Sequence, residues 1–289
     1  MKGLFGRAKL YAKMVQLEHT LFALPFSLGA MLLAAHGLPA PGTIGWILVA
    51  LVSGRCFAMG MNRYADRHFD LLNPRTADRV LPGRQLGLTE VRLFLAGSAG
   101  LLVVATLFLP PLCLRLLPVA LGLLTLYSYM KRFTAYAHFV LGLCLATAVA
   151  GSWIAVRGTL DGAICVLATS VVLWVAGFDI LYAGQDIAFD REHGLHSLPA
   201  RLGLERSQRV SRALHAASGA GIWATGLALG LGWGYFGGCL VITGLIAYEH
   251  VLVAGGDLSR INRAFFHINA LVSTTFLAGV ALEVFLGAW

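Results

Sequence analysis

The feature that most constrains this chain is a series of apolar segments, each long enough to cross a lipid bilayer. A membrane helix needs about 20 apolar residues to span roughly 30 Å of hydrocarbon. The chain has 289 residues, of which 58% are hydrophobic and only 12% are charged, and its mean hydropathy is +0.76. This composition predicts an all-α, polytopic membrane protein. Nine transmembrane helices are expected, at about 20–36, 43–61, 90–109, 112–129, 137–156, 161–181, 212–231, 233–254 and 266–287.

The basic residues alternate with these apolar segments as membrane topology requires. Most of the 22 Lys and Arg residues fall on segments that share one side of the membrane if the N-terminus is inside. Basic loops stay on the cytoplasmic side. The N-terminus and the polar stretches 62–89 and 185–211 are therefore expected to be cytoplasmic, and the C-terminus outside. Topology accounts for the net charge of +8, so nucleic acid is not expected as a partner.

The chain is expected to form one membrane domain over residues 1–289, because no low-complexity tract or polar linker divides it. The stretches 62–89 and 185–211 each follow an apolar segment and begin with a pair of Asp residues. Both stretches end in a similar short run of small residues and Arg. The similarity indicates an internal duplication offset by four helices, which would bring the two stretches together across a pseudo-two-fold axis.

Two pairs of carboxylates stand out in a chain with few acidic residues. Asp66 and Asp70 are four residues apart, as are Asp186 and Asp190. On a helix, residues at this spacing lie one turn apart on the same face. Four converging carboxylates beside a membrane are costly unless a cation neutralises them. Hard oxygen ligands suggest Mg²⁺, whereas helix capping explains single Asp residues better than two matched pairs.

Each pair belongs to a longer polar stripe. Arg55 and Asn62 precede the first pair at helical spacing, and Asp179 and Tyr182 precede the second. A polar stripe on an otherwise apolar helix should face a cavity inside the bundle and not lipid. We therefore expect both stripes to line one polar cavity.

Three further cations lie close to these stripes in sequence. Lys131 follows Tyr127 by one helical turn, and Arg75 and Arg79 follow the first Asp pair. A lysine can bind a phosphate oxygen as a point charge, and arginines present forked donors that match a diphosphate. Each of these residues, considered by itself, could instead only anchor a helix at the membrane surface, and this alternative stays open.

These motifs resemble the UbiA-type intramembrane prenyltransferases, and the resemblance covers nearly the whole chain. The first motif is Asn-x-x-x-Asp-x-x-x-Asp and the second is Asp-x-x-Tyr-Ala-x-x-Asp-x-x-x-Asp. They are accompanied by a Tyr-x-x-x-Lys element and by the loop sequence Asn-Pro-Arg-Thr. The matching residues are Asn62, Asp66 and Asp70; Asp179, Tyr182, Ala183, Asp186 and Asp190; Tyr127 and Lys131; and Asn73 to Thr76.

The resemblance implies Mg²⁺-dependent transfer of a polyprenyl group from its diphosphate to an aromatic acceptor. It implies two Mg²⁺ ions held by the four paired Asp residues, with Asn62 nearby and with Lys131, Arg75 and Arg79 adding positive charge. Ionisation of the allylic C–O bond of the donor would give an allylic cation, which a ring carbon of the acceptor would attack. Aromatic rings such as Phe22 or Tyr182 could stabilise this cation. The resemblance also implies a fold of nine transmembrane helices around a central cavity with cytoplasmic Asp-rich loops, and a location in the bacterial cytoplasmic (inner) membrane.

The acceptor is left open by the sequence. The segments 18–26 and 190–203 are most similar to the bacterial 4-hydroxybenzoate polyprenyltransferase group and to its relatives in menaquinone synthesis. Some relatives prenylate an aminodeoxyfutalosine-type acceptor instead. Arg55, two turns inside Asn62, is a plausible partner for an acceptor carboxylate, and His19 at the cytoplasmic mouth of the first span is a candidate contact.

Two other classes of protein use acidic residues in membranes. A cation-coupled secondary transporter would place its carboxylates near the bilayer midplane, whereas these pairs lie at predicted cytoplasmic helix ends beside Arg-rich loops. A CDP-alcohol phosphotransferase requires an Asp-x-x-Asp-Gly signature, which this chain lacks. The pattern therefore favours phosphate chemistry at the membrane surface. It does not indicate the prenyl chain length or the oligomeric state.

Overall fold

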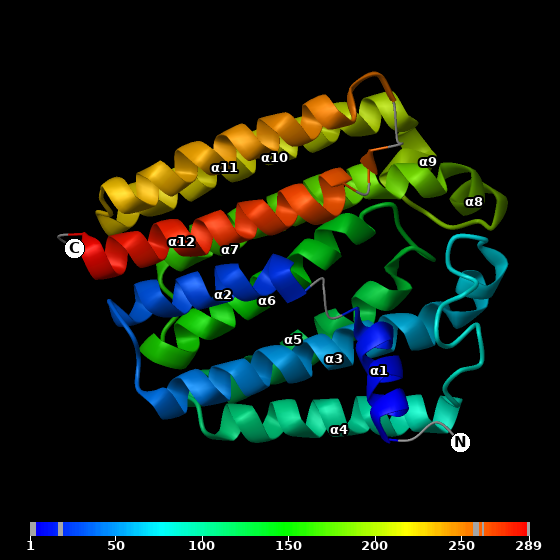
Figure 1. Ribbon diagram of the computed structural model, residues 1–289, viewed down its shortest axis with the longest axis horizontal. Coiled ribbons are helices and arrows are strands. Elements are labelled where there is room, and N and C mark those ends of the chain that lie inside the picture. The colour runs from blue at the N-terminus through cyan, green and yellow to red at the C-terminus, as the bar shows by residue number, and fades with distance from the viewer. Residues whose placement is uncertain (1–3, 17–19, 257–259, 262, 288–289) are drawn as a thin grey trace.

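A computed structural model describes residues 4–16, 20–256, 260–261 and 263–287 of the chain. The described residues contain helices and connecting turns and no strand. The long helices run roughly parallel and antiparallel to one another in Figure 1. They are α2 (Thr20–Ala35), α3 (Pro41–Leu72), α4 (Leu88–Leu107), α5 (Pro111–Met130), α6 (Ala137–Arg157), α7 (Gly162–Ala183), α10 (Leu204–Leu229), α11 (Trp233–Leu252) and α12 (Asn269–Leu286).

Shorter elements gather at one end of this bundle. They include the helices α8 (Ile187–Glu192) and α9 (Leu198–Leu202), the 3₁₀ turns Gly184–Asp186 and Ala254–Gly256, and a π-helical turn at Arg263–Ile268. The loop that follows α3 lies at this same end, on the right in Figure 1, and the link between α2 and α3 lies at the other. The two Asp-rich stretches are thus brought to one end of the molecule.

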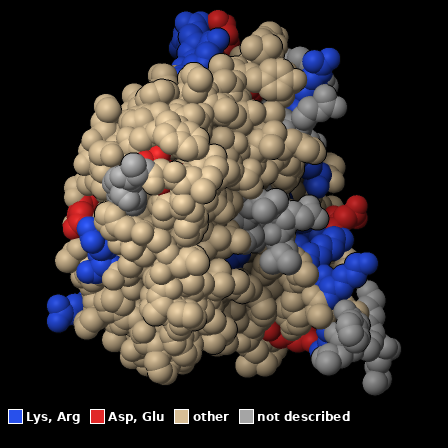
Figure 2. All heavy atoms as spheres, turned by 60° about the vertical axis from the view of Figure 1, so that its left-hand side comes forward, with Lys and Arg blue, Asp and Glu red and all other residues tan. Residues whose placement is uncertain are grey.

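The prediction of an all-α membrane fold is confirmed. Each of the nine predicted segments contains a helix, and seven of the described helices are long and apolar enough to cross a membrane. The apolar part of α2 is shorter, Phe22–Ala35, and α10 begins with a charged turn around Glu205 and Arg206. Figure 2 shows a face whose centre carries almost no charged side chains, with Lys, Arg, Asp and Glu at its margins. The count of nine spans stays a prediction.

One predicted boundary differs in a way that matters for the site. The second apolar segment was expected to end near residue 61, but α3 continues to Leu72. No proline or glycine interrupts residues 62–72, so nothing stops the helix until Asn73, which is extended (φ −88°, ψ 117°) and precedes Pro74. Asp66 and Asp70 consequently lie on a continuous helix that extends beyond the apolar core.

The core of the bundle forms around α7. Large side chains such as Phe26, Trp153, Trp174 and Phe276 are at most 2% exposed, and they belong to one cluster that joins α2, α6, α7, α10, α11 and α12. Close packing depends on small residues: a Cβ at Gly142 of α6 would lie 2.5 Å from a backbone oxygen of α7. A rigid α7 of this kind holds the second Asp stripe in a fixed position.

Helix α1 (Leu4–Val15) lies across the other helices near the Asp-rich end (Figure 1). Its buried side chains, Leu10, Met14 and Val15, pack into a second cluster with residues of α3, α4 and α5. Tyr11 stacks on Phe94 with ring centroids 5.0 Å apart. The helix is therefore amphipathic, with one face on the bundle and its lysines exposed.

Candidate functional site

The two predicted polar stripes, apart from Arg55, line one cavity at the Asp-rich end of the bundle. This cavity, called the acidic cavity below, has a volume of about 170 Å³. It receives side chains from α3, α5, α7, α8 and the loop after α3. Eleven of the predicted site residues line it: Asn62, Asp66, Asp70, Arg75, Arg79, Tyr127, Lys131, Asp179, Tyr182, Asp186 and Asp190.

The first carboxylate pair is presented by α3. Asn62 lies one turn before Asp66, and its Nδ2 donates to Asp66 Oδ2 at 2.9 Å. Asp70 is 6% exposed and accepts from Arg79 Nη1 at 2.5 Å through Oδ1. Its other oxygen, Oδ2, is buried without a hydrogen-bond partner among the described residues. A buried acceptor of this kind is costly unless a ligand satisfies it.

The second pair is arranged differently from the expected single helix. Helix α7 ends at Ala183, a 3₁₀ turn covers Gly184–Asp186, and α8 then carries Asp190. Glycine at 184 lowers the helical preference here. The stripe that starts at Asp179 is thus bent at Asp186, yet all its members still face the acidic cavity.

Every one of the four paired carboxylates contacts a different cation. Arg75 donates to Asp186 from Nε and Nη2 at 3.2 and 2.6 Å, and Lys131 Nζ lies 3.4 Å from the buried Asp190. Arg132 Nη2 lies 3.5 Å from Asp66, and Arg79 pairs with Asp70. Such pairs offset the mutual repulsion of four acids in a partly desolvated site.

Arg75 shows how strongly these groups interact. Its guanidinium also donates to the Tyr182 hydroxyl at 3.1 Å. Burial alone would lower the pKa of Arg75, but the hydrogen bonds and charge of Asp186 outweigh it and raise this pKa above the ordinary value for arginine. The loop after α3 is therefore linked to α7 by a charged, bidentate contact.

Asp179 is held from behind by a histidine. His138 of α6 is fully buried, and its Nδ1 lies 2.6 Å from Asp179 Oδ2. The Leu198 backbone N–H donates to His138 Nε2 at 3.3 Å, so Nδ1 carries the proton and donates to Asp179. His138 is therefore a buried polar residue whose two ring nitrogens both have hydrogen-bond partners. The same geometry gives His138 a further role, because it orients a residue of the cavity.

The donor set fits a hard divalent cation. Four carboxylates supply oxygen ligands, and Asp70 Oδ2 is buried and unpartnered. Magnesium prefers such ligands. Across the described ranges, no three acidic, His or Cys side chains already converge closely enough to hold a metal ion, which agrees with the pairing of each carboxylate to a cation.

Arg55 lies elsewhere than expected. It does not line the acidic cavity. Its Nη2 donates to the carbonyl oxygens of Val15 and Gln16, at 3.4 and 3.2 Å, at the C-terminal end of α1. The long side chain of Arg55 reaches the negative end of a neighbouring helix, a favourable partner for a cation. The assignment of Arg55 to the acceptor stays a prediction that this position does not favour.

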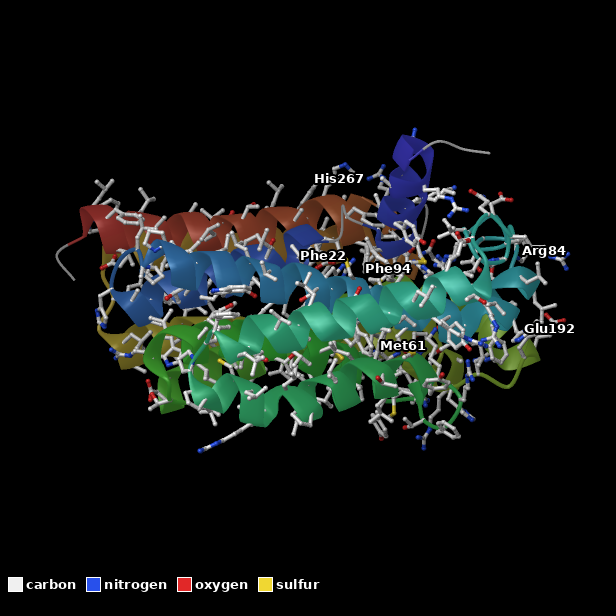
Figure 3. All side chains as sticks on the ribbon, turned by 90° about the horizontal axis from the view of Figure 1, so that it is seen from below. Phe22, Met61, Arg84, Phe94, Glu192 and His267 are labelled. Carbon is white, nitrogen blue, oxygen red and sulfur yellow. The ribbon has the colours of Figure 1, made fainter. Side chains whose placement is uncertain are left out.

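The two remaining predicted residues lie outside the acidic cavity or outside the described residues. Phe22 is 6% exposed and packs at 5.4 Å, centroid to centroid, against Phe265, which in turn lies 4.1 Å from the ring of Tyr182. Phe22 lies deeper in the bundle than Arg84 and Glu192, which mark the Asp-rich end in Figure 3. An aromatic wall thus runs inward from Tyr182. His19 falls outside the residues that the structure describes.

Five polar residues that line the acidic cavity were not predicted as site residues: Arg63, Asn73, Thr76, Ser128 and Arg132. Asn73 donates to Asp186 Oδ1 at 3.3 Å, Arg132 contacts Asp66, and Arg63 is buried beside Asn62. The two arginines were counted only as topological charges, because both are near a predicted membrane surface. Their spacing did carry a signal, since each directly follows a predicted site residue, Asn62 or Lys131.

Comparison with known proteins identifies the family. The family model described as "UbiA prenyltransferase family" matches residues 23–271. A 4-hydroxybenzoate octaprenyltransferase of Vibrio cholerae is 31% identical over 284 residues, which cover 96% of this chain and 98% of the relative.

Two solved structures show the same fold. The apo structure of a UbiA homologue from Aeropyrum pernix K1 has a TM-score of 0.84 and 31% identity, and it covers 92% of this chain and 98% of its own. A UbiA homologue from Archaeoglobus fulgidus, solved with DMAPP and Mg²⁺, has a TM-score of 0.71 at 17% identity, with coverage of 95% and 98%. The fold, the acidic cavity and these matches lead to one conclusion: the chain belongs to the UbiA prenyltransferase family.

Proposed function

We propose that this protein transfers a polyprenyl group from polyprenyl diphosphate to a 4-hydroxybenzoate-like aromatic acceptor in quinone biosynthesis, with Mg²⁺ as cofactor. The observation that carries the proposal is the acidic cavity, where four carboxylates and four matched cations meet at the end of an apolar bundle. Similarity to the Vibrio cholerae octaprenyltransferase supports the acceptor class, and the Archaeoglobus fulgidus homologue bound to DMAPP and Mg²⁺ supports the donor class and the metal.

The acidic and the basic residues of the cavity have different binding roles. Asp66, Asp70, Asp186 and Asp190 would hold Mg²⁺, which when bound supplies positive charge to the diphosphate leaving group. With a metal on these carboxylates, Arg75, Arg79, Lys131 and Arg132 would be available to donate to the phosphate oxygens. Their charge stabilises the pyrophosphate as the allylic C–O bond breaks.

The aromatic residues beside the acidic cavity also suit the reaction of the prenyl group. The aromatic wall of Tyr182, Phe265 and Phe22 lies next to the position expected for the diphosphate. Ring faces stabilise a nearby cation electrostatically. The acceptor ring carbon attacks the allylic carbon and the ring loses its proton, which restores aromaticity. The apolar tail of the donor extends into the bundle or the surrounding bilayer.

We also propose that the protein resides in the bacterial cytoplasmic membrane with the Asp-rich end facing the cytoplasm. The basic residues at that end support this orientation, because positively charged segments are retained inside. Both substrates suit the location: the isoprenoid donor partitions into lipid and an aromatic acid is soluble in the cytosol.

The test is a direct transfer assay. The purified protein in nanodiscs receives Mg²⁺, a labelled polyprenyl diphosphate and either a panel of hydroxybenzoates or aminodeoxyfutalosine. Prenylated hydroxybenzoate that forms with Mg²⁺ and not with EDTA supports the proposal. Product from aminodeoxyfutalosine alone would assign the protein to the alternative acceptor. Full turnover in EDTA by a variant that combines Asp66→Ala and Asp186→Ala would exclude the mechanism.

A cation-coupled transporter is the alternative from another class. Coupled transport would place carboxylates near the bilayer midplane, whereas the four paired Asp residues of the acidic cavity lie near helix ends and each contact an arginine or lysine. Cation uptake by proteoliposomes without any transferase activity would favour that alternative.

A further inference from the structure

A π-helical turn immediately before α12 places one aromatic ring against the wall of the acidic cavity. The turn covers Arg263–Ile268, and the ring of its Phe265 lies 4.1 Å, centroid to centroid, from the ring of Tyr182, which lines the cavity. Phe265 is buried and also packs against Phe22 and Phe178, at 5.4 and 5.3 Å between centroids. The position of this turn therefore determines where the aromatic wall lies.

A side-chain amide holds the turn in place. Asn269, the first residue of α12, is fully buried, and its Nδ2 donates to the carbonyl oxygen of Phe265 at 3.1 Å. Hydrogen bonds join residues five apart in a π-helix and four apart in an α-helix, so backbone groups lose their regular partners where one form passes into the other. The Asn269 amide supplies a donor at this point, to the residue that carries the aromatic ring.

Glu249 of α11 fixes the amide in turn. Its Oε1 accepts from Asn269 Nδ2 at 2.9 Å, and Glu249 is 1% exposed. The backbone carbonyl of Phe265 and the carboxylate oxygen are both acceptors, so both hydrogens of Nδ2 are used and a reversed amide would lose both bonds. A continuous series of contacts thus runs from Glu249 to the ring of Tyr182.

The surroundings of Glu249 favour a role in positioning over a role in stability. Its Oε2 is buried without a hydrogen-bond partner among the described residues. His215 Nδ1 lies 3.7 Å from this oxygen, but His215 bonds elsewhere, to the Trp174 carbonyl oxygen and to His250. A buried carboxylate with an unused oxygen lowers stability, whereas its bond to a buried amide selects one geometry.

We propose that Glu249 and Asn269 are positioning residues for prenyl transfer, which hold Phe265 in the aromatic wall so that the wall keeps water from the allylic cation. The inference rests on the proposed function and adds to it two residues that do not line the acidic cavity. Water competes with the acceptor, because its oxygen can bond to the allylic carbon and then lose a proton, which gives a polyprenol beside the released pyrophosphate. Enzymes prevent such side reactions by excluding water from the site.

The experiment measures how each variant divides the donor between the two products. Labelled polyprenyl diphosphate is supplied with Mg²⁺ and saturating 4-hydroxybenzoate, and the ratio of prenylated acceptor to polyprenol is determined. Asn269→Asp keeps the size of the side chain but removes the amide donor, and Glu249→Leu removes the acceptor. Both should lower the ratio about 10- to 100-fold, the effect of a small displacement near reacting atoms. Glu249→Gln keeps an acceptor oxygen and should restore a ratio near that of the wild type.

Glu283→Leu is the matched control. Glu283 is also a buried carboxylate between α11 and α12, but it accepts from the backbone N–H groups of Gly232 and Gly234, at 2.7 and 3.0 Å, at the opposite end of these helices. Its replacement should lower the unfolding temperature, as Glu249→Leu should, and leave the product ratio unchanged.

Hydrogen exchange adds a measurement that does not depend on activity. Residues 265–269 should exchange faster in Asn269→Asp and Glu249→Leu than in the wild type, and at the wild-type rate in Glu283→Leu.

The outcomes separate the inference from the proposed function. A wild-type product ratio in folded Asn269→Asp or Glu249→Leu would overturn the inference, as would an equal fall in Glu283→Leu. If one of the two disruptive variants fails to fold, the other decides. A wild type that does not prenylate 4-hydroxybenzoate would instead contradict the proposed function, and unchanged exchange of residues 265–269 in the variants would by itself contradict the positioning of the turn.

Discussion

At the scale of single residues, the acidic cavity holds four carboxylates close together by giving each a cation. Arg75 and Asp186 are 111 positions apart in sequence but meet at 2.6 Å, so the pairing also joins the two halves of the bundle. If a metal–diphosphate complex binds these carboxylates as proposed, part of its binding free energy would be used to separate the pairs. A phosphate oxygen that replaces each carboxylate as the partner of the cation would compensate for that loss.

The paired carboxylates should be indispensable for turnover. Asp186→Asn removes a negative ligand and weakens the bidentate contact with Arg75. Loss of several kcal/mol of transition-state stabilisation corresponds to roughly 100-fold or more in kcat/KM. Prenyl transfer measured as a function of Mg²⁺ concentration tests this, with Asp78→Asn, an exposed acid in the loop after α3, as the control. Equal loss in both variants would contradict a specific role for Asp186.

His138 should stabilise the protein and orient Asp179. His138→Ala leaves Asp179 and the Leu198 backbone N–H without the partners seen at 2.6 and 3.3 Å. Unsatisfied buried groups cost about 1–3 kcal/mol each. We expect a lower unfolding temperature in detergent and a reduced kcat. A variant with wild-type stability and activity would show that this contact is dispensable.

Residue types and helical spacing were sufficient to predict eleven of the residues that line the acidic cavity, because Asp, Asn and Tyr are rare on apolar helices and stand out there. The sequence could not separate Arg63 and Arg132 from topological charges, since both functions require a cation at a membrane surface. Nor could it show the partner of Arg55. That partner belongs to α1, and only the folded bundle brings α1 beside α3.

At the scale of elements, α1 covers a cavity of about 1090 Å³ that its inner face helps to line, and two polar contacts supplement its apolar packing. Arg55 bonds to the last carbonyl oxygens of α1, and Arg7 pairs with Glu90 of α4 at 2.7 Å. In Figure 3, α1 stands at an angle to the long helices beside Phe94. Elements held by few contacts open more readily than the packed core.

Loss of Arg55 should therefore loosen α1. Arg55→Ala removes donors from the Val15 and Gln16 carbonyl oxygens, and trypsin should then cleave faster at Lys9 and Lys13 in the folded protein. Arg55→Lys, which keeps a donor, should be cleaved at an intermediate rate. If α1 stays protected while the acceptor KM rises at least about 10-fold, an effect within the range of one hydrogen bond to a charge, Arg55 instead binds the acceptor.

The break between α7 and α8 is the main difference between the predicted and the observed helices. Spacing of four residues predicted one straight stripe, but the 3₁₀ turn at Gly184–Asp186 bends the chain there. The first stripe has no such break, because α3 contains no glycine beyond Gly60. The two halves thus share a polar pattern without sharing backbone geometry. Periodicity alone cannot reveal such a difference, because one 3₁₀ turn changes it only slightly.

At the scale of the whole molecule, the arrangement of long helices implies that the Asp-rich end and the link between α2 and α3 lie on opposite sides of the membrane. Cysteine replacing Glu192 at the first end and Leu38 at the second, in a background without the five native cysteines, tests this. A membrane-impermeant maleimide applied to intact cells should label the Leu38 position only. Labelling of both positions would contradict the orientation.

The last prediction is that α10 crosses the membrane although it is not among the seven helices that are apolar enough by composition. It has 26 residues, about 39 Å at 1.5 Å per residue, which exceeds the roughly 30 Å of hydrocarbon. Its charged first turns would then project into the cytoplasm. A cysteine in place of Arg206 should be labelled like the cysteine at the Glu192 position. Trp233 is 66% exposed, and a cysteine in its place should be labelled like the cysteine at the Leu38 position. Equal labelling of Arg206→Cys and Trp233→Cys would mean that α10 lies along one surface and that the number of spans is not nine.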